Sequence, residues 1–555
     1  MTPFARLLTG LVFTPSRNAK LTLLRNYFST APDPDRGWAL AAIAGEMDLR
    51  AVQPSIIRAL VEERVDPVLF RLSYDYVGDL AETVSLIWPT EDEGTAKPIR
   101  LGDVVDALAA ASRSDTPALL ARLLDRLPSD ERFALIKLAT GGLRVGVSAR
   151  LAKTALAEWA AEQGLEIGVE QIEELWHGLE PPYVPLFRWL SGEAPAPEVD
   201  LALAFRPMML AHPIDAALYS AEELKINTES EAETRTRLDA KLAPGEFAAE
   251  WKWDGIRVQA IATDTGRRLY SRTGEEISGA FPDVLEAMTW RGAVDGELLV
   301  VRDGAVAPFA DLQKRLGRKT VSAKMLRDFP AHIRAYDLLH DGQSDLRPLA
   351  LTERRRALEA WMAANTAERL DLSPAIAFNR WEDLADIRAG ARDAAQEGVM
   401  LKRWDAAYVG GRPMGPWFKW KRDPLSADCV LMYAQRGHGK RSSFYSDYTF
   451  GAWRDGAEGA ELTPVGKAYS GYTDEELAKL DRWIRNNTTD RYGPVRAVTP
   501  ALVFEVAFDA VQASTRHKSG VAMRFPRIKR IRWDKPAHEA DRLETLERMI
   551  VGSGG

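Results

Sequence analysis

The segment Glu250-Trp251-Lys252-Trp253-Asp254-Gly255-Ile256-Arg257 is the most informative stretch of this chain. It has the pattern of a strand that runs into a tight turn at Gly255. Because alternate side chains of a strand share a face, Glu250, Lys252 and Asp254 are predicted to point the same way. Burial or neighbouring cations lower the pKa of a lysine and make its amine nucleophilic. Lys252 is therefore either a covalent nucleophile, partly desolvated by its two flanking tryptophans, or a half-exposed lysine before a hairpin turn.

Six further segments downstream combine charged and aromatic residues. Taken singly, each has an ordinary explanation, since an aromatic in a strand is usually core and alternating lysines are usually a solvated face. Together they supply a nucleophile, a wall for a base, carboxylates for Mg²⁺ and cations for a triphosphate. In chain order the segments are Ser271–Glu275 with Arg272, Val294–Leu299 with Glu297, Arg334–Leu339 with Tyr336, Gln396–Lys402 with Glu397, Trp417–Lys421 with Lys419 and Lys421, and Arg524–Lys535 with Arg532 and Lys535.

Length and composition indicate a multidomain globular protein. The 555 residues are too many for one core, and 46% hydrophobic with 28% charged residues is ordinary for a soluble chain. No apolar run approaches the ~20 residues of a membrane span, and Phe4–Phe13 is predicted to be a first helix rather than a signal peptide. The single cysteine, Cys429, excludes an intrachain disulfide and a multi-cysteine zinc site, and it fits a cytoplasmic location.

Charge is distributed unevenly along the chain. The net charge is −7, yet residues 516–535 contain eight Lys/Arg against one acidic residue, Asp534. This region predicts contact with phosphates despite the overall sign, and the alternative is a solvated basic loop.

The pattern of the chain changes near residue 205 and again near Pro424. The first part is helical in pattern, with apolar residues at helical spacing behind a Thr116-Pro117 start signal, namely Leu120, Leu123, Leu124 and Leu127. Strands mixed with helices follow: a strand pair over Phe247–Thr263, strands over Ala293–Arg302 and Ala331–Leu339, and helices over Leu351–Ala364 and Trp381–Gln396. The last part is strand-rich and predicts a small β-barrel, in which Leu502, Phe504, Val506 and Phe508 share one face.

A glycine-rich turn, Gly141–Val147, separates two predicted helices in the first part. Such a turn can present backbone N–H groups to DNA phosphates, with Arg144 and Gly146 as candidate contacts. The alternative is a plain connection between helices. Proline-rich stretches at 181–185 and 193–198 mark the edge of this region.

In content, order and approximate spacing, these motifs resemble the ATP-dependent DNA ligases, and the resemblance covers almost the whole chain. It implies a multidomain α+β protein with an all-α DNA-binding domain (1–204), a mixed α/β, antiparallel-sheet nucleotidyltransferase domain (205–424), a C-terminal OB-fold β-barrel (425–545) and a short tail (546–555). The implied reaction seals 3′-OH/5′-phosphate nicks in duplex DNA through a lysine–AMP intermediate and a DNA-adenylate, serving replication, repair and recombination.

The resemblance also implies a role for each candidate residue. Lys252 would bind AMP covalently, Glu250 would accept a hydrogen bond from the adenine amino group, and Tyr336 would stack on the base. Arg257 and Arg272 would contact the ribose and phosphates, or the nick's 5′-phosphate, and Arg412 would make a further nucleotide contact. Glu297 and Glu397 would bind Mg²⁺, with Mn²⁺ as an alternative. Lys419 and Lys421 would neutralise the α-phosphate, and Arg532 and Lys535 would orient the pyrophosphate.

Other classes share parts of the pattern. NAD⁺-dependent ligases share the lysine motif but resemble a layout with a cysteine-rich zinc module. RNA ligases and capping guanylyltransferases share the catalytic core without this helical first region, and a DNA-end-binding scaffold would lack the intact lysines and carboxylates.

The expected partners are ATP and nicked double-stranded DNA, which a monomeric ligase would encircle in the cytoplasm on the nucleoid. Lys421–Pro424 is the predicted hinge for closure of the barrel.

Overall fold

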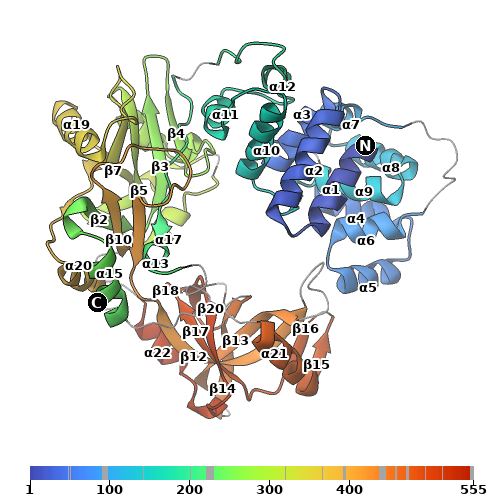
Figure 1. The fold of residues 1–555 in the computed structure, drawn as a ribbon. Helices are drawn as coiled ribbons and strands as arrows, with labels where there is room; N and C mark the ends of the chain where they lie inside the picture. Colours follow the sequence, from blue (N-terminus) through green and yellow to red (C-terminus); the bar gives the residue numbers. More distant parts are fainter. Residues whose placement is uncertain are drawn as a thin grey trace. The chain divides into compact units, whose positions relative to one another are not determined.

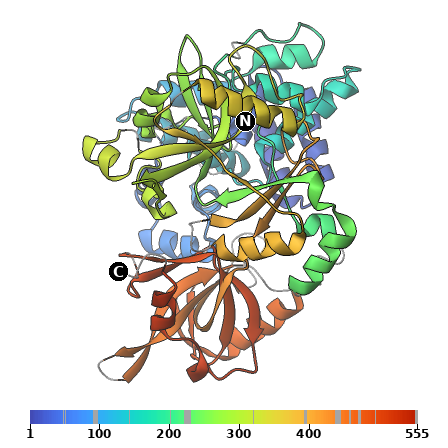
Figure 2. The same cartoon turned by 90° about the vertical axis from the view of Figure 1, so that its left-hand side faces the viewer.

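The computed structural model describes residues 1–550 except for 48, 50–51, 90–97, 142, 200–201, 221–230, 319, 366, 392–395, 437–444, 457–458, 470–473, 494 and 516 (Figures 1 and 2). Arg516 of the predicted basic region, Gly142 of the predicted DNA-binding turn and the last five residues of the predicted tail therefore lie outside it. The chain forms two compact units. One contains Met1–Val169, Glu180–Pro197 and Pro424–Gly555, and the other contains Glu170–Leu179 and Glu198–Asp423.

The regular secondary structure in the described residues of the N-terminal part of the first unit consists of helices, which confirms the predicted helical region. Its helices are α1 (Thr2–Phe13), α2 (Arg17–Thr30), α3 (Asp35–Ala44), α4 (Pro54–Glu62), α5 (Pro67–Val77), α6 (Leu80–Ile87), α7 (Leu101–Ala110), α8 (Thr116–Arg126), α9 (Ser129–Ala139), α10 (Ala149–Glu162) and α12 (Val184–Leu190). The predicted first helix is α1. None of the helices in the described part of the chain has the length and apolarity that a membrane crossing needs.

Helix starts in this region follow from local sequence signals. α8 begins at Thr116 with Pro117 in its first turn, and its predicted leucines are buried. α10 begins after Ser148, whose hydroxyl accepts a hydrogen bond from the Leu151 N–H at 3.2 Å. The apolar stripe that each helix presents packs against its neighbours and forms the core.

The second unit contains two sheets. The five-stranded sheet has the order β1-β11-β10-β2-β9, and the six-stranded sheet has the order β4-β3-β5-β7-β8 with β6 paired to β5. The strands are β1 (His212–Pro213), β2 (Phe247–Trp253), β3 (Ile256–Ala262), β4 (Arg267–Ser271), β5 (Gly292–Arg302), β6 (Ala305–Val306), β7 (Ala331–His340), β8 (Leu370–Leu372), β9 (Ala375–Ile376), β10 (Gln396–Arg403) and β11 (Trp417–Lys421). The helices are α11 (Val169–Trp176), α13 (Asp215–Leu218), α15 (Glu231–Lys241), α16 (Pro282–Ala287), α17 (Phe309–Gln313), α18 (Ala323–Asp328), α19 (Leu351–Ala364) and α20 (Trp381–Ala389).

Three details of this unit differ from the sequence expectation. The strands β2 and β3 form as predicted but do not pair with each other, because each joins a different sheet. The helix predicted over Trp381–Gln396 ends at Ala389, and Gln396 begins β10. The alternation that aims Lys252 at one face of β2 aims Trp251 and Trp253 at the opposite face. There Trp251 packs against the core and the Trp253 indole donates to Ser373 at 3.1 Å, so the predicted shielding by the two tryptophans is wrong.

The C-terminal part of the first unit is strand-rich, as predicted. Its strands are β12 (Leu425–Arg436), β13 (Tyr445–Gly456), β14 (Gly459–Ala468), β15 (Thr488–Tyr492), β16 (Val495–Val498), β17 (Val503–Phe508), β18 (Ala510–Ala513), β19 (Val521–Arg524) and β20 (Arg527–Arg532), with helices α21 (Asp474–Asn486) and α22 (Leu543–Arg548). The long strand β12 pairs with β13, β16 and β17, and β17 pairs with β20. The residues Leu502, Phe504, Val506 and Phe508 lie in one core cluster, which confirms their predicted shared face.

Candidate active site

Lys252 lies on β2, in the sheet that also contains β10 and β11. The register places Lys252 opposite Gly398 of β10, and Gly398 opposite Lys421 of β11. Two residues along, the next row of the sheet contains Glu250 on β2 and Lys419 on β11. Because every second row of a sheet shares a face, these four charged residues lie on one face.

An irregularity in β10 brings the Glu397 side chain to the Lys252 amine. The pairing of β10 with β2 shifts register between Gln396 and Gly398, so that Glu397 is the extra residue of a β-bulge. The Glu397 carboxylate accepts a hydrogen bond from the Lys252 amine and lies 3.5 Å from the Lys421 amine. Gly398 has a φ of +136°, and a Cβ at this position would overlap the backbone of β11, so the bulge requires glycine.

A second carboxylate reaches this site from the six-stranded sheet. Glu297 lies on β5, directly opposite Arg257 of β3. Burial raises the pKa of Glu297 to about 8; the positive charges of Lys252 and Arg257 oppose this rise, and the negative charges of Glu397 and Asp295 add to it. Two carboxylates from two different sheets, Glu297 and Glu397, thus act on one site together with Lys252.

Cations surround the same site. Burial lowers the pKa of Lys419, and positive charges nearby lower it further. Those charges belong to Arg412, Lys252, Lys421 and Arg272. Burial also lowers the pKa of Arg272, which lies near Arg257 and Arg412. The structure therefore brings together every predicted phosphate-binding cation of this unit.

The predicted base-binding residues form one side of the site. The Lys402 amine lies 4.4 Å from the ring centroid of Tyr336 and 2.9 Å from the Glu250 carboxylate. Glu250 is 3% exposed, and Arg355 Nη1 lies 3.6 Å from its other oxygen. Arg355 Nη1 is buried without a hydrogen-bond partner in the described part of the chain. A carboxylate with a nearby guanidinium can hydrogen-bond to the edge of a base, and an aromatic ring can stack on its face.

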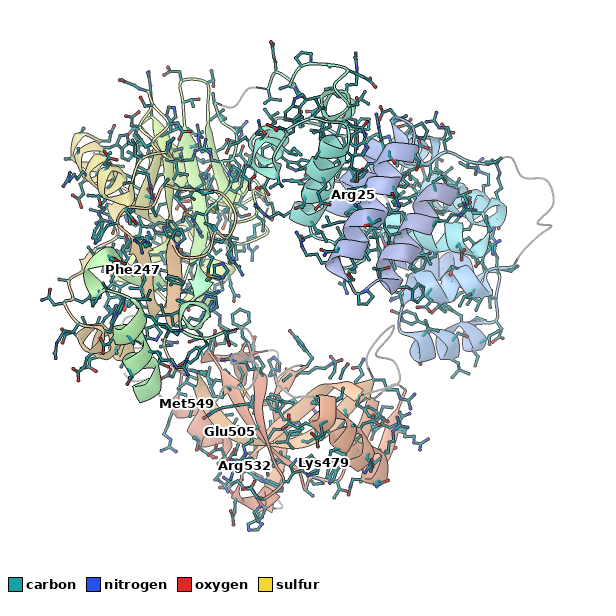
Figure 3. All side chains as sticks on the ribbon, viewed as in Figure 1. Arg25, Phe247, Lys479, Glu505, Arg532 and Met549 are labelled. Carbon is teal, nitrogen blue, oxygen red and sulfur yellow. The ribbon has the colours of Figure 1, made fainter. Side chains whose placement is uncertain are left out.

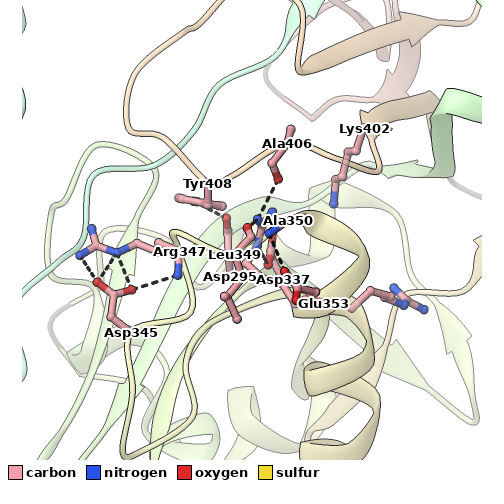
Figure 4. A network of polar contacts seen from close by, with 12 residues as sticks. Asp295, Asp337, Asp345, Arg347, Leu349, Ala350, Glu353, Lys402, Ala406 and Tyr408 are labelled. Atoms are coloured by element: carbon pink, nitrogen blue, oxygen red, sulfur yellow. Dashed lines mark hydrogen bonds and ion pairs between the residues drawn. The ribbon is translucent and has the colours of Figure 1, made fainter.

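Arg257 belongs to a buried polar network with Asp295 and Tyr408, and Figure 4 shows the contact between the last two. Its Nε and Nη2 donate to the Asp295 carboxylate at 3.0 and 2.6 Å, and its Nη1 donates to the Met209 carbonyl at 2.6 Å. The Tyr408 hydroxyl donates to Asp295 at 2.6 Å and accepts from Arg257 Nη2 at 3.1 Å. Because Tyr408 follows β10 whereas Asp295 lies on β5, the network joins the two sheets that form the site.

The predicted cations of the C-terminal part belong to the other compact unit. Arg532, labelled in Figure 3, ends β20, and its guanidinium donates to both oxygens of Asp534 at 3.1 and 3.0 Å. The Lys535 amine donates to Asp428 at 2.7 Å, and Arg532 lies 3.5 Å from the same carboxylate. Asp428 and Asp534 thus hold the two cations beside each other.

The glycine-rich turn of the N-terminal part has an unusual backbone. Arg144 and Gly146 both have positive φ angles, of 40° and 66°, and both are exposed. The buried Lys20 amine donates to the carbonyls of Val145 and Gly146 at 2.9 and 2.8 Å. The Lys20 amine thereby ties the turn to α2.

Comparisons with known proteins identify the family. The model of the ATP dependent DNA ligase domain matches residues 227–421, the model of the ATP dependent DNA ligase C terminal region matches 441–535, and the DNA ligase N terminus model matches 2–157. A probable DNA ligase of Koribacter versatilis is 31% identical over 97% of this chain and 95% of its own. The chain belongs to the ATP-dependent DNA ligases. It is an enzyme that seals nicks in DNA with ATP, as its family does.

Two further comparisons agree with the assignment of this chain to the ligase family. A probable DNA ligase of Anaeromyxobacter sp. is 34% identical over 80% of this chain and 82% of its own. A solved structure designated Pmar-Lig_PreS3 has a TM-score of 0.59 at 14% identity, covering 95% of this chain and 99% of that one. This last likeness concerns the fold alone.

Several residues of the ligase site escaped the sequence interpretation. Lys402 ends the predicted Gln396–Lys402 segment, but the sequence interpretation gave it no role. It follows Gly398 by four residues in one strand, so even spacing along β10 could have placed it on the face of Lys252. Asp295, Tyr408 and Arg355 carry no local signal, because their partners are far away in the sequence.

Proposed function

We propose that this ligase uses Lys252 as its covalent nucleophile. The observation that carries the proposal is the bond from the Lys252 amine to Glu397, at a point where Glu297 and several cations also converge. A nucleophilic amine must lose its proton before it attacks, and Glu397 is in position to accept that proton.

Three transfers then follow, each with one bond formed and one broken. The Lys252 nitrogen attacks the α-phosphorus of ATP, and pyrophosphate leaves. An oxygen of the nick's 5′-phosphate attacks the same phosphorus, and the lysine nitrogen leaves. Finally the 3′-hydroxyl oxygen attacks the 5′-phosphorus, loses its proton, and AMP leaves. Each step gathers negative charge on phosphate oxygens, which Lys419, Lys421 and Arg412 are proposed to stabilise. Arg272 is proposed to contact the nick's 5′-phosphate once Lys252 has been adenylated.

The adenine is proposed to bind between Glu250 and Tyr336. Glu250 would accept from the adenine amino group, and Tyr336 would stack on the ring. Guanine would turn its O6 oxygen toward the Glu250 carboxylate, which explains a preference for ATP over GTP. Arg257, whose donors are directed at protein groups, would contribute its charge from 5.8 Å behind Tyr336 rather than a direct hydrogen bond.

Glu297 and Glu397 are proposed to hold Mg²⁺, with Mn²⁺ as the alternative. The fit rests on the chemistry of the donors: the negative charge of Glu397 helps to raise the pKa of Glu297, and a cation between the two carboxylates would relieve that repulsion. Mg²⁺ commonly takes one or two carboxylates and completes its shell with water and substrate phosphate oxygens. When bound, the ion would neutralise charge on the phosphates.

The remaining assignments extend the proposal to the other unit. The C-terminal strands are proposed to form an OB-fold (425–545) that supplies Arg532 and Lys535 to the pyrophosphate. It would close over the adenylation domain (205–424) by a hinge at Lys421–Pro424. The helical domain (1–204) would bind duplex phosphates through Arg144 and Gly146, so that a monomer encircles the nick on the nucleoid in the cytoplasm.

Transfer of label from ATP tests the central proposal. The protein is incubated with ATP labelled at the α-phosphate and then chased with nicked DNA. Label is expected on the wild type and on Lys314→Ala, an exposed lysine of the same unit, but not on Lys252→Ala. The label should leave as the nick is sealed. Label on Lys252→Ala, or label released only to nicked RNA, would refute the proposal.

A further inference from the structure

A short piece of the N-terminal region belongs to the unit that carries Lys252. Residues Glu170–Leu179, which include most of α11, lie in this unit, whereas the residues on both sides of the piece lie in the other. Glu174 of α11 accepts hydrogen bonds from Arg347 at 2.5 and 3.2 Å. Asp345 holds the same guanidinium at 2.7 Å. These ion pairs fix α11 to the segment that follows β7.

The residue after α11, His177, lies directly against the turn that carries Arg272. A Cβ built at Gly274 of this turn would lie 2.7 Å from His177 Nε2, so the imidazole rests on the turn backbone. The ring packs edge-on against Phe205, with centroids 4.8 Å apart, and lies 6.2 Å from Tyr270. His177, Phe205 and Tyr270 therefore form an aromatic support beneath the turn.

The turn that carries Arg272 is closed by its own hydrogen bonds and is anchored to the sheet through β4, in which Ser271 pairs with Val258. The Gly274 N–H donates to the Ser271 carbonyl at 2.9 Å, and the Ser271 N–H donates to the Glu275 carbonyl at 2.8 Å. Both bonds lie within the turn, and the Arg272 side chain extends from it into an exposed position. Of the groups near Gly274, His177 lies nearest to the position that a Cβ would take, so its ring supports the turn that carries Arg272.

We propose that His177 is a positioning residue that directs Arg272 toward the 5′-phosphate of the nick. The inference rests on the proposed phosphate-binding role of Arg272 and deepens it. Because Lys252 is adenylated before the nick arrives, loss of His177 should spare adenylation and slow the transfer of AMP to DNA. A misplacement of about 1 Å at a reacting group can cost about 10²-fold in rate.

The test compares two nicks on ligase that has already been adenylated. One nick carries a 5′-phosphate and the other a 5′-hydroxyl, and the ratio of their affinities measures contact with the phosphate. Single-turnover AMP transfer is measured on the phosphorylated nick. The variants are His177→Ala, His177→Phe, which keeps a ring under the turn, and Arg272→Ala. His538→Ala is the matched control, since that histidine is 81% exposed.

We expect His177→Ala to adenylate Lys252 normally and to lose most of its preference for the 5′-phosphate nick over the 5′-hydroxyl nick. Its transfer of AMP should be about 10²-fold slower, and Arg272→Ala should behave in the same way. His177→Phe and His538→Ala should resemble the wild type. The proposal is overturned if His177→Ala keeps the ratio while Arg272→Ala loses it, or if adenylation falls in parallel with transfer. If Arg272→Ala itself keeps the ratio, the assigned role of Arg272 fails instead, and the proposal fails with it.

Discussion

Replacing Gly398 by alanine should slow adenylation of Lys252 by about 10²-fold. The φ of +136° costs an alanine on the order of 1–3 kcal/mol. In addition, the new Cβ would lie 2.7 Å from Lys421 Cα and 2.9 Å from the Arg422 nitrogen. These atoms belong to the main chain, so β11 must move by roughly 0.5–1 Å. That displacement carries the lysines of β11 away from the α-phosphate, at a cost of about 2.7 kcal/mol in the barrier.

Gly415→Ala separates this steric effect from backbone strain. Gly415 also has a positive φ, of +104°, but a Cβ at this position meets nothing within 4 Å. Both variants are tested for the single-turnover rate of AMP transfer from labelled ATP to the protein, and for thermal stability. Gly415→Ala is expected to lose some stability and to keep its rate within a few-fold of the wild type. Equal rates in the two variants would refute the reasoning, because strain alone would then account for the effect.

Three further outcomes are expected. Because the pKa of Glu297 is raised from 4.5 to about 8, its carboxylate fraction grows as the pH rises through about 8. Adenylation at low Mg²⁺ should rise over that range, and Glu297→Gln should flatten the pH–rate profile. Tyr408→Phe removes the hydroxyl that donates to the buried Asp295 carboxylate at 2.6 Å. It should lower the free energy of unfolding by about 2 kcal/mol, which is measured as faster hydrogen exchange in β5. Lys402→Met removes the 2.9 Å partner of Glu250 and should raise the KM for ATP at least tenfold, and an unchanged KM would contradict that pairing.

Local periodicity is sufficient to predict part of the site. The alternation of β2 places Glu250 beside Lys252, and the alternation of β11 places Lys419 beside Lys421, because a strand repeats every two residues. The structure has both pairs on the same face of one sheet. Such predictions need only the backbone geometry of a single element.

The contacts between elements could not be predicted in the same way. Lys402 and Glu250 are 152 residues apart, and Tyr408 and Asp295 are 113 residues apart. Their meeting depends on which strands are neighbours, and strand order is a property of the whole sheet. For the same reason, the sequence indicated a strand pair around Gly255, whereas β2 and β3 belong to different sheets.

The division of the chain into units has a practical consequence for exchanging parts between ligases. The backbone passes from one compact unit to the other four times, at 169/170, 179/180, 197/198 and 423/424. No single cut therefore isolates the catalytic unit. A fragment that begins at residue 198 would keep the Arg347–Asp345 pair but lose Glu174, the second carboxylate that accepts from Arg347. A chimaera that takes its N-terminal helices from another ligase should keep residues 170–179 of the recipient.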